Sequence, residues 1–418
     1  MAVAVARVLR SRAFQGWCVL LLCAELLGIA LVQGVARSYD FRAFYAAGHL
    51  SRTSLSHLYD LGFQKAIQDG FVSPLPGVRP FYHPSFEALL FIPFSLLPYG
   101  AAYIVGIAIN CILLGFAYVT GPRHTAFPLA RYARAFTFFT FLPGFLTIIV
   151  GQDSILFLLL CCLAFQRLEK HDEWGAGFFI GLGIFRPQLA IPIGLLLGIR
   201  YGWRFLTSFA AVSAVLAGLS AFLIRKAGVV ALTSLISTIS LVHNHGGEVQ
   251  KAMSVYPQRM PNLYGLLYIC GTRHLSAAAS FVVTAFASLI VFACCAFVVR
   301  KAKTVAISFG IAIIGASLLS YHFSSYDAVI LILPILLLSG GIHTYLVVVC
   351  YILPYLLFFW GIPDWFALLA PVPLALLLVA ARHVLTGRQN RPTKLEHSPQ
   401  SEDLEATAHP NSVSTAAR

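Results

Sequence analysis

Long apolar runs are the feature that most constrains how this chain can fold. A helix needs about 20 mainly apolar residues to cross the hydrocarbon core of a bilayer, and several runs approach that length. We therefore predict an all-α polytopic membrane bundle with about 10 to 12 spanning or half-spanning helices. The runs cover residues 14–33, 99–120, 132–150, 154–166, 175–199, 203–224, 276–299, 304–320, 327–338, 343–360 and 363–381.

Composition agrees with a membrane protein and leaves little room for a soluble domain. Hydrophobic residues make up 59% of the chain and charged residues 11%, and mean hydropathy is +0.81. The net charge of +13 comes mainly from connections between apolar runs, where basic residues set topology, so we expect no nucleic-acid partner. The nine cysteines fall within apolar segments without zinc-site spacing, which predicts packing residues and no disulfides.

The basic connections predict the orientation of the bundle in the plasma (inner) membrane. Connections rich in Lys and Arg stay in the cytoplasm, and the N-terminus, with Arg7, Arg10 and Arg12, goes with them. The remaining connections then share the outer face, where we expect the active site. They are the 34–85 loop, the turn at Gly151, the break at Arg186, the 243–262 loop and the segment 321–327.

The C-terminal segment differs in composition from the apolar part of the chain. We predict one transmembrane domain over residues 1–384 and a disordered cytoplasmic tail over residues 385–418, which is polar and mixed in charge. The first apolar run is either a membrane anchor or a cleaved signal peptide. Its length and the lack of a clear cleavage site after it favour the anchor.

The run 175–199 contains the sequence Phe185-Arg186-Pro187-Gln188, which should interrupt it. Proline removes a backbone donor and ends or kinks a helix. We predict two half-helices that meet at Arg186. The break should line a cavity, because non-helical backbone at membrane depth is tolerated where it lines a water-filled cavity. Runs 86–97 and 327–338 are also too short to span.

Asp40 lies just beyond the first apolar run, in a stretch rich in aromatic residues. A charged side chain at the centre of a membrane helix costs roughly 2.5 to 3.5 kcal/mol on insertion scales, so charged residues near the membrane tend to be functional or anchoring. A carboxylate in this position indicates chemistry at the lipid surface. The alternative interpretation is a topology signal or a helix cap.

Several short motifs in the predicted outer connections resemble glycosyltransferase family 87. They are Asp40-Phe41 followed by Phe44-Tyr45 and Gly48, then Leu58-Tyr59-Asp60, Tyr82-His83-Pro84, Gly151-Gln152-Asp153-Ser154 and Arg186-Pro187-Gln188. The resemblance spans about residues 38–340 and rests on the order of the motifs. Arg186 stands where Lys-Pro is common, and Pro261-Asn262-Leu263-Tyr264-Gly265 matches only loosely.

The resemblance implies the GT-C fold and a transferase that takes a sugar from a polyprenyl-phosphate carrier. The sugar would be a mannose-like hexose or a pentose, transferred with inversion to a lipid or glycan acceptor at the outer face. By resemblance, Asp40 is the general base for the acceptor hydroxyl. No cofactor is implied beyond the lipid-linked substrate.

Such a transfer also needs a cation beside the departing phosphate. Arg186 at the helix break, with Gln188 and Arg42, is the predicted phosphate site; the alternatives are a headgroup anchor for Arg186 and a solvated surface charge for Arg42. Further polar and aromatic residues of the outer connections are candidate substrate contacts: Tyr45, Tyr82, His83, Gln152, Asp153, His322 and Asp327.

Each of these contacts also has a simpler interpretation. Histidines beside apolar helices are often only hydrogen-bonded, and interfacial aromatic belts have the same composition as a sugar-binding surface. A set of His and carboxylate residues can bind a cation, but the spacing here is not diagnostic, and we expect no metal. The alternative functions are a transporter or flippase for polyprenyl-linked sugars and a non-catalytic scaffold. The absence of an internal repeat disfavours the first, and the clustering of polar residues on one face disfavours the second.

Overall fold

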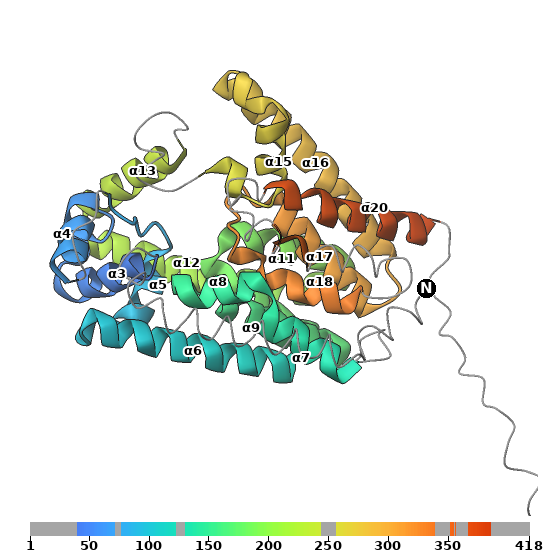
Figure 1. Cartoon of the computed structure of the whole chain (residues 1–418), viewed down its shortest axis with the longest axis horizontal. Coiled ribbons are helices and arrows are strands. Elements are labelled where there is room, and N and C mark those ends of the chain that lie inside the picture. The colour runs from blue at the N-terminus through green and yellow to red at the C-terminus, as the bar shows by residue number, and fades with distance from the viewer. Residues whose placement is uncertain are drawn as a thin grey trace, which may run out of the picture.

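The computed structural model describes residues 40–71, 77–122, 130–243, 256–338, 352–354, 356 and 367–385. The first apolar run and nearly all of the predicted tail lie outside these residues. Within them every regular element is a helix (Figure 1). The described part of the chain is therefore an all-α bundle, as the apolar runs predict.

The described helices are given in chain order. In the N-terminal half they are α3 (Phe41–Thr53), η3 (Leu55–His57), α4 (Leu61–Phe71), α5 (Ser85–Ala88), η4 (Leu89–Phe91), η5 (Phe94–Leu96), α6 (Tyr99–Thr120), α7 (Ala130–Thr140), α8 (Leu142–Val150), α9 (Ser154–Glu169), α10 (Glu173–Leu182) and η6 (Gly183–Phe185). In the C-terminal half they are α11 (Pro187–Tyr201), α12 (Trp203–Ala227), α13 (Val229–His243), η7 (Pro257–Arg259), α15 (Leu263–Cys270), η8 (Thr272–His274), α16 (Ala277–Lys301), α17 (Val305–Leu319), η9 (Asp327–Leu331), α18 (Ile332–Leu337) and α20 (Pro371–Leu385).

Three described helices, α6, α12 and α16, are long and apolar enough to cross a membrane. At about 1.5 Å per residue, the 22 residues of α6 reach the roughly 30 Å of a hydrocarbon core. Large apolar side chains on these helices are exposed, among them Ile112 and Phe116 on α6 and Phe281 and Phe286 on α16. Such surfaces suit lipid contact, so the chain is a membrane helix bundle.

The core of the bundle lies around α9, α11 and α17. Every residue from Ser308 to Leu318 of α17 is buried, and Phe309 packs edge-on against Phe165 of α9. Helices α10 and α12 approach closely because Gly177 of α10 faces the backbone carbonyl of Phe205, where a Cβ would clash. These contacts fix the helices whose ends carry the polar residues described below.

Two predicted runs are interrupted. The break within 175–199 is confirmed. Helix α10 continues into η6, which ends at Phe185. Arg186 has a non-helical backbone, and Pro187 opens α11. The run 132–150 is also divided, into α7 and α8, at Phe141. Pro143 lies in the first turn of α8, where a missing backbone N–H is tolerated.

Residues 40–71 and 77–84 form a helical layer at one end of the bundle, where α3, α4 and α13 gather (Figure 1). Two glutamines of α4 hold the loop that follows. The backbone N–H of Phe81 donates to Gln64 Oε1 at 2.7 Å, and Gln68 bonds both backbone groups of Arg79, at 3.0 and 2.7 Å. The loop before α5 is thereby fixed in place against the layer.

Candidate active site

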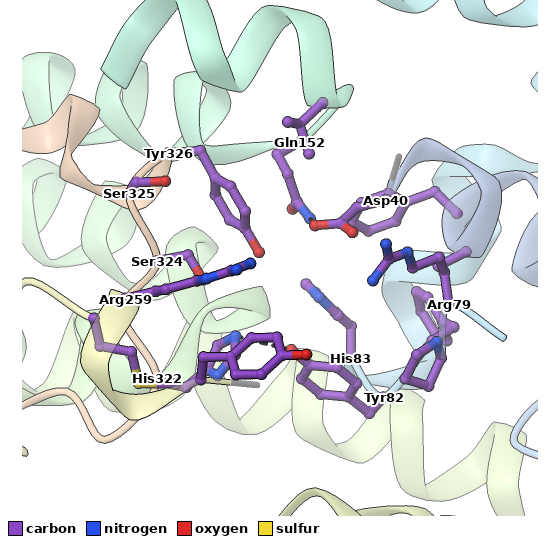
Figure 2. A pocket seen from close by; sticks show the side chains of 17 residues that line it. Asp40, Arg79, Tyr82, His83, Gln152, Arg259, His322, Ser324, Ser325 and Tyr326 are labelled. Carbon is purple, nitrogen blue, oxygen red and sulfur yellow. Dashed lines mark hydrogen bonds between the residues drawn. The ribbon is translucent and has the colours of Figure 1, made fainter. Parts of the chain in front are cut away.

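A cavity of about 260 Å³ opens between the helical layer and the polar connections of the bundle. Five segments far apart in the sequence supply its walls (Figure 2). They are the start of α3, the loop 79–83, the α8–α9 turn, residues 256–260 and residues 322–326. The lining includes Asp40, Arg79, Tyr82, His83, Gln152, Arg259, His322 and Tyr326.

Asp40 stands at the N-cap position of α3, yet its side chain makes no cap hydrogen bond. Its Oδ2 atom instead accepts a hydrogen bond of 2.8 Å from Gln152 Nε2, and the residue lines the cavity. The capping interpretation of this carboxylate therefore does not match the geometry. A carboxylate that borders the cavity is in a position to accept a proton from a bound hydroxyl.

Gln152 is held in place by the tight turn between α8 and α9. Gly151 has a φ of 72°, a left-handed conformation that suits glycine, and a Cβ there would lie 2.6 Å from the Cβ of Phe41. Asn110 Nδ2 of α6 donates to the backbone carbonyl of Gln152 at 3.1 Å. The turn thus lies directly against the start of α3, which brings the Gln152 carboxamide to Asp40.

Arg186 lies behind Gln152 and is only 2% exposed. It donates to Gln152 Oε1 at 2.8 Å, to Asp153 Oδ1 through Nε at 2.9 Å, and to Asp327. Asp327 is itself fixed by Ser154 Oγ, at 2.8 Å. We call Gln152, Asp153, Arg186 and Asp327 the Arg186 network; it joins the helix break to Asp40 through one carboxamide.

His83 and Glu87 form a second polar group beside the network. His83 Nδ1 and Glu87 Oε2 are 3.0 Å apart. Burial lowers the pKa of His83 to about 4, so its imidazole is neutral. Burial, and then the charge of Asp153, raise the pKa of Glu87. Among the described residues, His83, Glu87 and Asp153 form a group whose donor atoms could hold a metal ion.

Tyr82 and His322 form a polar contact in the cavity wall, where the helical layer meets the bundle. The Tyr82 hydroxyl lies 2.9 Å from His322 Nε2. The backbone carbonyl of His322 accepts a hydrogen bond of 2.7 Å from Ser320 Oγ, which fixes the loop after α17. Burial lowers the pKa of His322 and raises that of Tyr82, so both side chains are neutral.

Two arginines line the cavity, Arg79 and Arg259. Figure 2 shows their guanidinium groups on different sides of the cavity, Arg79 on the side of Asp40 and Arg259 on the side of Ser324 and Tyr326. The guanidinium of Arg259 lies over the ring of Tyr256, 4.4 Å from its centroid. We call Arg79 and Arg259 the cavity arginines.

Glu87, Arg79 and Arg259 were not among the site residues predicted from the sequence. The spacing of His83 and Glu87, four residues apart at the start of a helix, was a signal for Glu87. Nothing in the sequence distinguishes Arg79 or Arg259 from other arginines of the connections. Their place on the cavity wall depends on the tertiary structure.

Six predicted site residues do not line the cavity, and two of them are Asp153 and Asp327 of the Arg186 network. Arg186 lies behind its wall, and Gln188 lies half-buried in the first turn of α11. Arg42 is fully buried and donates to the backbone carbonyl of Gln68 at 3.1 Å, and the Tyr45 hydroxyl donates to that of Leu97 at 2.9 Å.

The direction of the Arg42 and Tyr45 side chains follows from the geometry of α3. Successive helix positions are rotated by roughly 100°, so residues three and four after Asp40 share its face. Those residues, Ala43 and Phe44, do line the cavity. Arg42 and Tyr45, two and five residues on, lie on the other side of the helix.

Residues 81–321 match glycosyltransferase family 87. The matched range covers more than half of the chain and contains Tyr82, His83, Gln152, Asp153 and Arg186, whereas Asp40 precedes it. Comparison with curated proteins and with solved structures gives no match.

Proposed function

The chain belongs to glycosyltransferase family 87, and from that premise we propose which transfer this glycosyltransferase performs. It moves a mannose-like hexose or a pentose from a polyprenyl-phosphate donor to a hydroxyl of a lipid or glycan acceptor. Transfer takes place at the outer face of the plasma membrane, with inversion at the anomeric carbon. The observation that carries the proposal is a carboxylate, Asp40, on the wall of a cavity that also contains two arginines.

The proposed step is a direct displacement. The acceptor oxygen forms a bond to the anomeric carbon while the bond from that carbon to the phosphate oxygen of the donor breaks. Asp40 takes the proton of the acceptor hydroxyl, and the phosphate leaves with the bonding electron pair. A positioned base contributes typically a factor of about 10² to 10⁴ to the rate of such a reaction.

The cavity arginines are the proposed ligands of the donor phosphate. They line the cavity itself, and a guanidinium presents paired N–H donors that match phosphate oxygens. Arg186 is separated from the cavity and already donates to Asp153, Asp327 and Gln152. We therefore assign it a positioning role in place of the phosphate contact that the sequence suggested.

In this role, the Arg186 network orients the base. Gln152 donates to Asp40 Oδ2 and accepts from Arg186, so one carboxamide links the catalytic carboxylate to a fixed cation. Hydrogen bonds that hold a group in its reactive orientation lower the activation free energy of the transfer. The group is already oriented in the ground state, so no orientation has to be imposed during the reaction. Tyr82, His83 and His322 remain proposed contacts for the sugar or the acceptor.

The proposed orientation rests on where the basic residues lie. The last turns of three helices are basic: Arg167 lies in that of α9, Arg200 in that of α11, and Arg300 and Lys301 in that of α16. Arg200 donates to the backbone carbonyl of Ala302, so the ends of α11 and α16 meet. Helices α9 and α11 begin at the opposite end, beside the cavity. Basic ends of this kind face the cytoplasm, which leaves the cavity at the outer face.

The test is sugar transfer by purified protein from a panel of radiolabelled polyprenyl-phosphate sugars. Asp40→Asn keeps the size of the side chain but is a far poorer proton acceptor, so turnover should fall by about 10² or more. Asp60→Asn is the matched control, because Asp60 belongs to the same helical layer, accepts from the backbone N–H of Gly62 at 2.8 Å and lies outside the cavity lining.

Near-wild-type turnover by well-folded Asp40→Asn protein would remove Asp40 from the mechanism. Loss of donor binding with unchanged chemistry would make it a binding residue. Movement of the intact donor across a bilayer, without transfer, would support the transporter in place of the transferase.

A further inference from the structure

The group formed by His83, Glu87 and Asp153 has the donor atoms of a small metal site. One imidazole nitrogen and two carboxylate oxygens, one from each residue, lie within 4.8 Å of one another. The residues come from the loop before α5, from α5 itself and from the α8–α9 turn. The cluster therefore joins two segments that are 66 residues apart, counting from Glu87 to Asp153.

Two oxygen atoms of this cluster are buried without a hydrogen-bond partner, Glu87 Oε1 and Asp153 Oδ2. The other oxygen of each carboxylate is engaged: Glu87 Oε2 with His83, and Asp153 Oδ1 with Arg186. The Glu87 side chain is 1% exposed and that of Asp153 is 9% exposed. Buried acceptors without a partner are costly, and two neighbouring carboxylates repel each other, so either a cation or a proton between Glu87 and Asp153 would stabilise the cluster.

We propose that His83, Glu87 and Asp153 bind a divalent transition-metal ion. A set that mixes imidazole and carboxylate ligands suits an ion such as Zn²⁺ or Mn²⁺. The ion would replace the hydrogen bond between His83 Nδ1 and Glu87 Oε2. Two ligand atoms at about 2.1 Å from one ion and at right angles to each other lie about 3 Å apart, close to the 3.0 Å that separates these two atoms. His83 then coordinates the ion through Nδ1, and any proton held by the cluster is released on binding.

The arrangement around the cluster supports a metal site. Arg186 donates to the Asp153 oxygen that is not needed for the ion, which fixes the orientation of that carboxylate. His83 also lines the cavity, so the ion lies at the cavity wall. This differs from the sequence-based expectation of no metal, because Glu87 was not recognised.

The experiment measures metal binding directly and does not depend on the proposed reaction. Purified protein in detergent is stripped with a chelator and titrated with Mn²⁺, with free Mn²⁺ followed by electron paramagnetic resonance. Bound Zn²⁺ is measured separately by mass spectrometry after dialysis. The wild type should bind about one ion per chain. Loss of a supporting partner typically weakens a metal site by about 10- to 100-fold, so Glu87→Gln and His83→Ala should weaken it by about 100-fold or more.

His57→Ala is the matched control. His57 and Asp60 form another histidine–carboxylate pair, 3.7 Å apart, but they are not part of the three-residue cluster. The control should bind the ion as tightly as the wild type. If the wild type binds neither metal, or if His57→Ala loses as much binding as Glu87→Gln, the metal site is ruled out. A shared proton between Glu87 and Asp153 then remains as the source of positive charge. The wild-type titration decides this even if a cluster variant fails to fold.

Discussion

Arg186 and the cavity arginines are cations that lie close together but in different environments. Arg186 is buried, and its guanidinium donates to two carboxylates and one carboxamide. Arg79 is half-buried and Arg259 is exposed, and both line the cavity. A buried ion is stable only when it is paired and hydrogen-bonded. A cation at a cavity wall, in contrast, is within reach of a ligand that enters the cavity.

This difference separates two roles that the sequence alone assigns to one residue. A helix break with a basic residue suggests an anion site, because the returning half-helix presents free N–H groups. At Arg186 the protein itself supplies the anions, through Asp153 and Asp327. The break therefore contributes rigidity to the site, and the proposed phosphate contact falls to residues of the connections.

The largest effect is expected from Arg186→Ala. Removal of one partner from a buried ion pair leaves unpaired charge behind and typically costs about 3 to 5 kcal/mol; here Asp153 and Asp327 both lose their cation. The unfolding midpoint in detergent should fall sharply, and activity should fall with it. Arg186→Lys should rescue the midpoint only in part, because one ammonium cannot reproduce the fork that contacts three side chains.

The triple variant Arg186→Met, Asp153→Asn, Asp327→Asn sharpens this prediction. It removes the charges together, so it should be clearly more stable than Arg186→Ala while remaining inactive. If Arg186→Ala kept the stability of the wild type and lost only donor affinity, Arg186 would be the phosphate ligand that the sequence predicted.

The next largest effect is expected at the cavity arginines. A hydrogen bond to a charged group contributes about 1.5 to 3 kcal/mol, so Arg79→Ala or Arg259→Ala should lower kcat/KM for the lipid-linked donor by roughly 10- to 150-fold. Stability should change less than in Arg186→Ala, because Gln68 still holds the backbone of Arg79. Steady-state kinetics with a polyprenyl-phosphate sugar and thermal unfolding measure the two effects.

Arg52→Ala is the control for the cavity arginines. It removes the same charge from the exposed last turn of α3, outside the cavity lining. If Arg52→Ala lowered kcat/KM as much as Arg79→Ala, the effect would come from general attraction to an anionic substrate and not from a phosphate site.

The fold was largely predictable from the sequence, because apolar run length and proline position act locally. The break at Arg186 follows from Pro187, and α9, α12, α16 and α17 coincide closely with their predicted runs. Position along the chain, in a turn or loop beside a helix end, identified five residues that line the cavity: Asp40, Tyr82, His83, Gln152 and His322.

The remaining site residues depend on packing that no single motif encodes. Arg42 and Tyr45 share a motif with Asp40, but the rotation of α3 directs them away from the cavity, Arg42 to the carbonyl of Gln68 and Tyr45 to that of Leu97. Glu87 lies inside an apolar run. It approaches Asp153 only because α5 packs beside the α8–α9 turn in the folded bundle. Pairing between distant segments determines these contacts.

A smaller effect is expected from Gln152→Met, which keeps the size of the side chain but cannot donate to Asp40 or accept well from Arg186. A single hydrogen bond contributes about 0.5 to 1.5 kcal/mol, so kcat should fall by roughly 3- to 10-fold. A positioning role predicts that KM for the donor stays unchanged. Gln188→Met is the matched control, because Gln188 lies near the same break and outside the cavity lining. A rise in KM without loss of kcat would show that Gln152 binds substrate instead.

The smallest effect is expected from Tyr82→Phe, which removes one hydroxyl from the contact between the helical layer and the bundle. The hydroxyl lies 2.9 Å from His322 Nε2, and loss of this neutral hydrogen bond should cost about 1 kcal/mol. Both partners are uncharged, so the Arg186 network and the cavity arginines keep their charges, and activity should fall by less than about tenfold. Tyr59→Phe is the comparison variant: its hydroxyl donates to the backbone carbonyl of His83 at 2.9 Å, within the helical layer alone. If Tyr82→Phe abolished transfer while Tyr59→Phe did not, the Tyr82 hydroxyl would act on the substrate directly, and the cavity wall would contain a catalytic group besides Asp40.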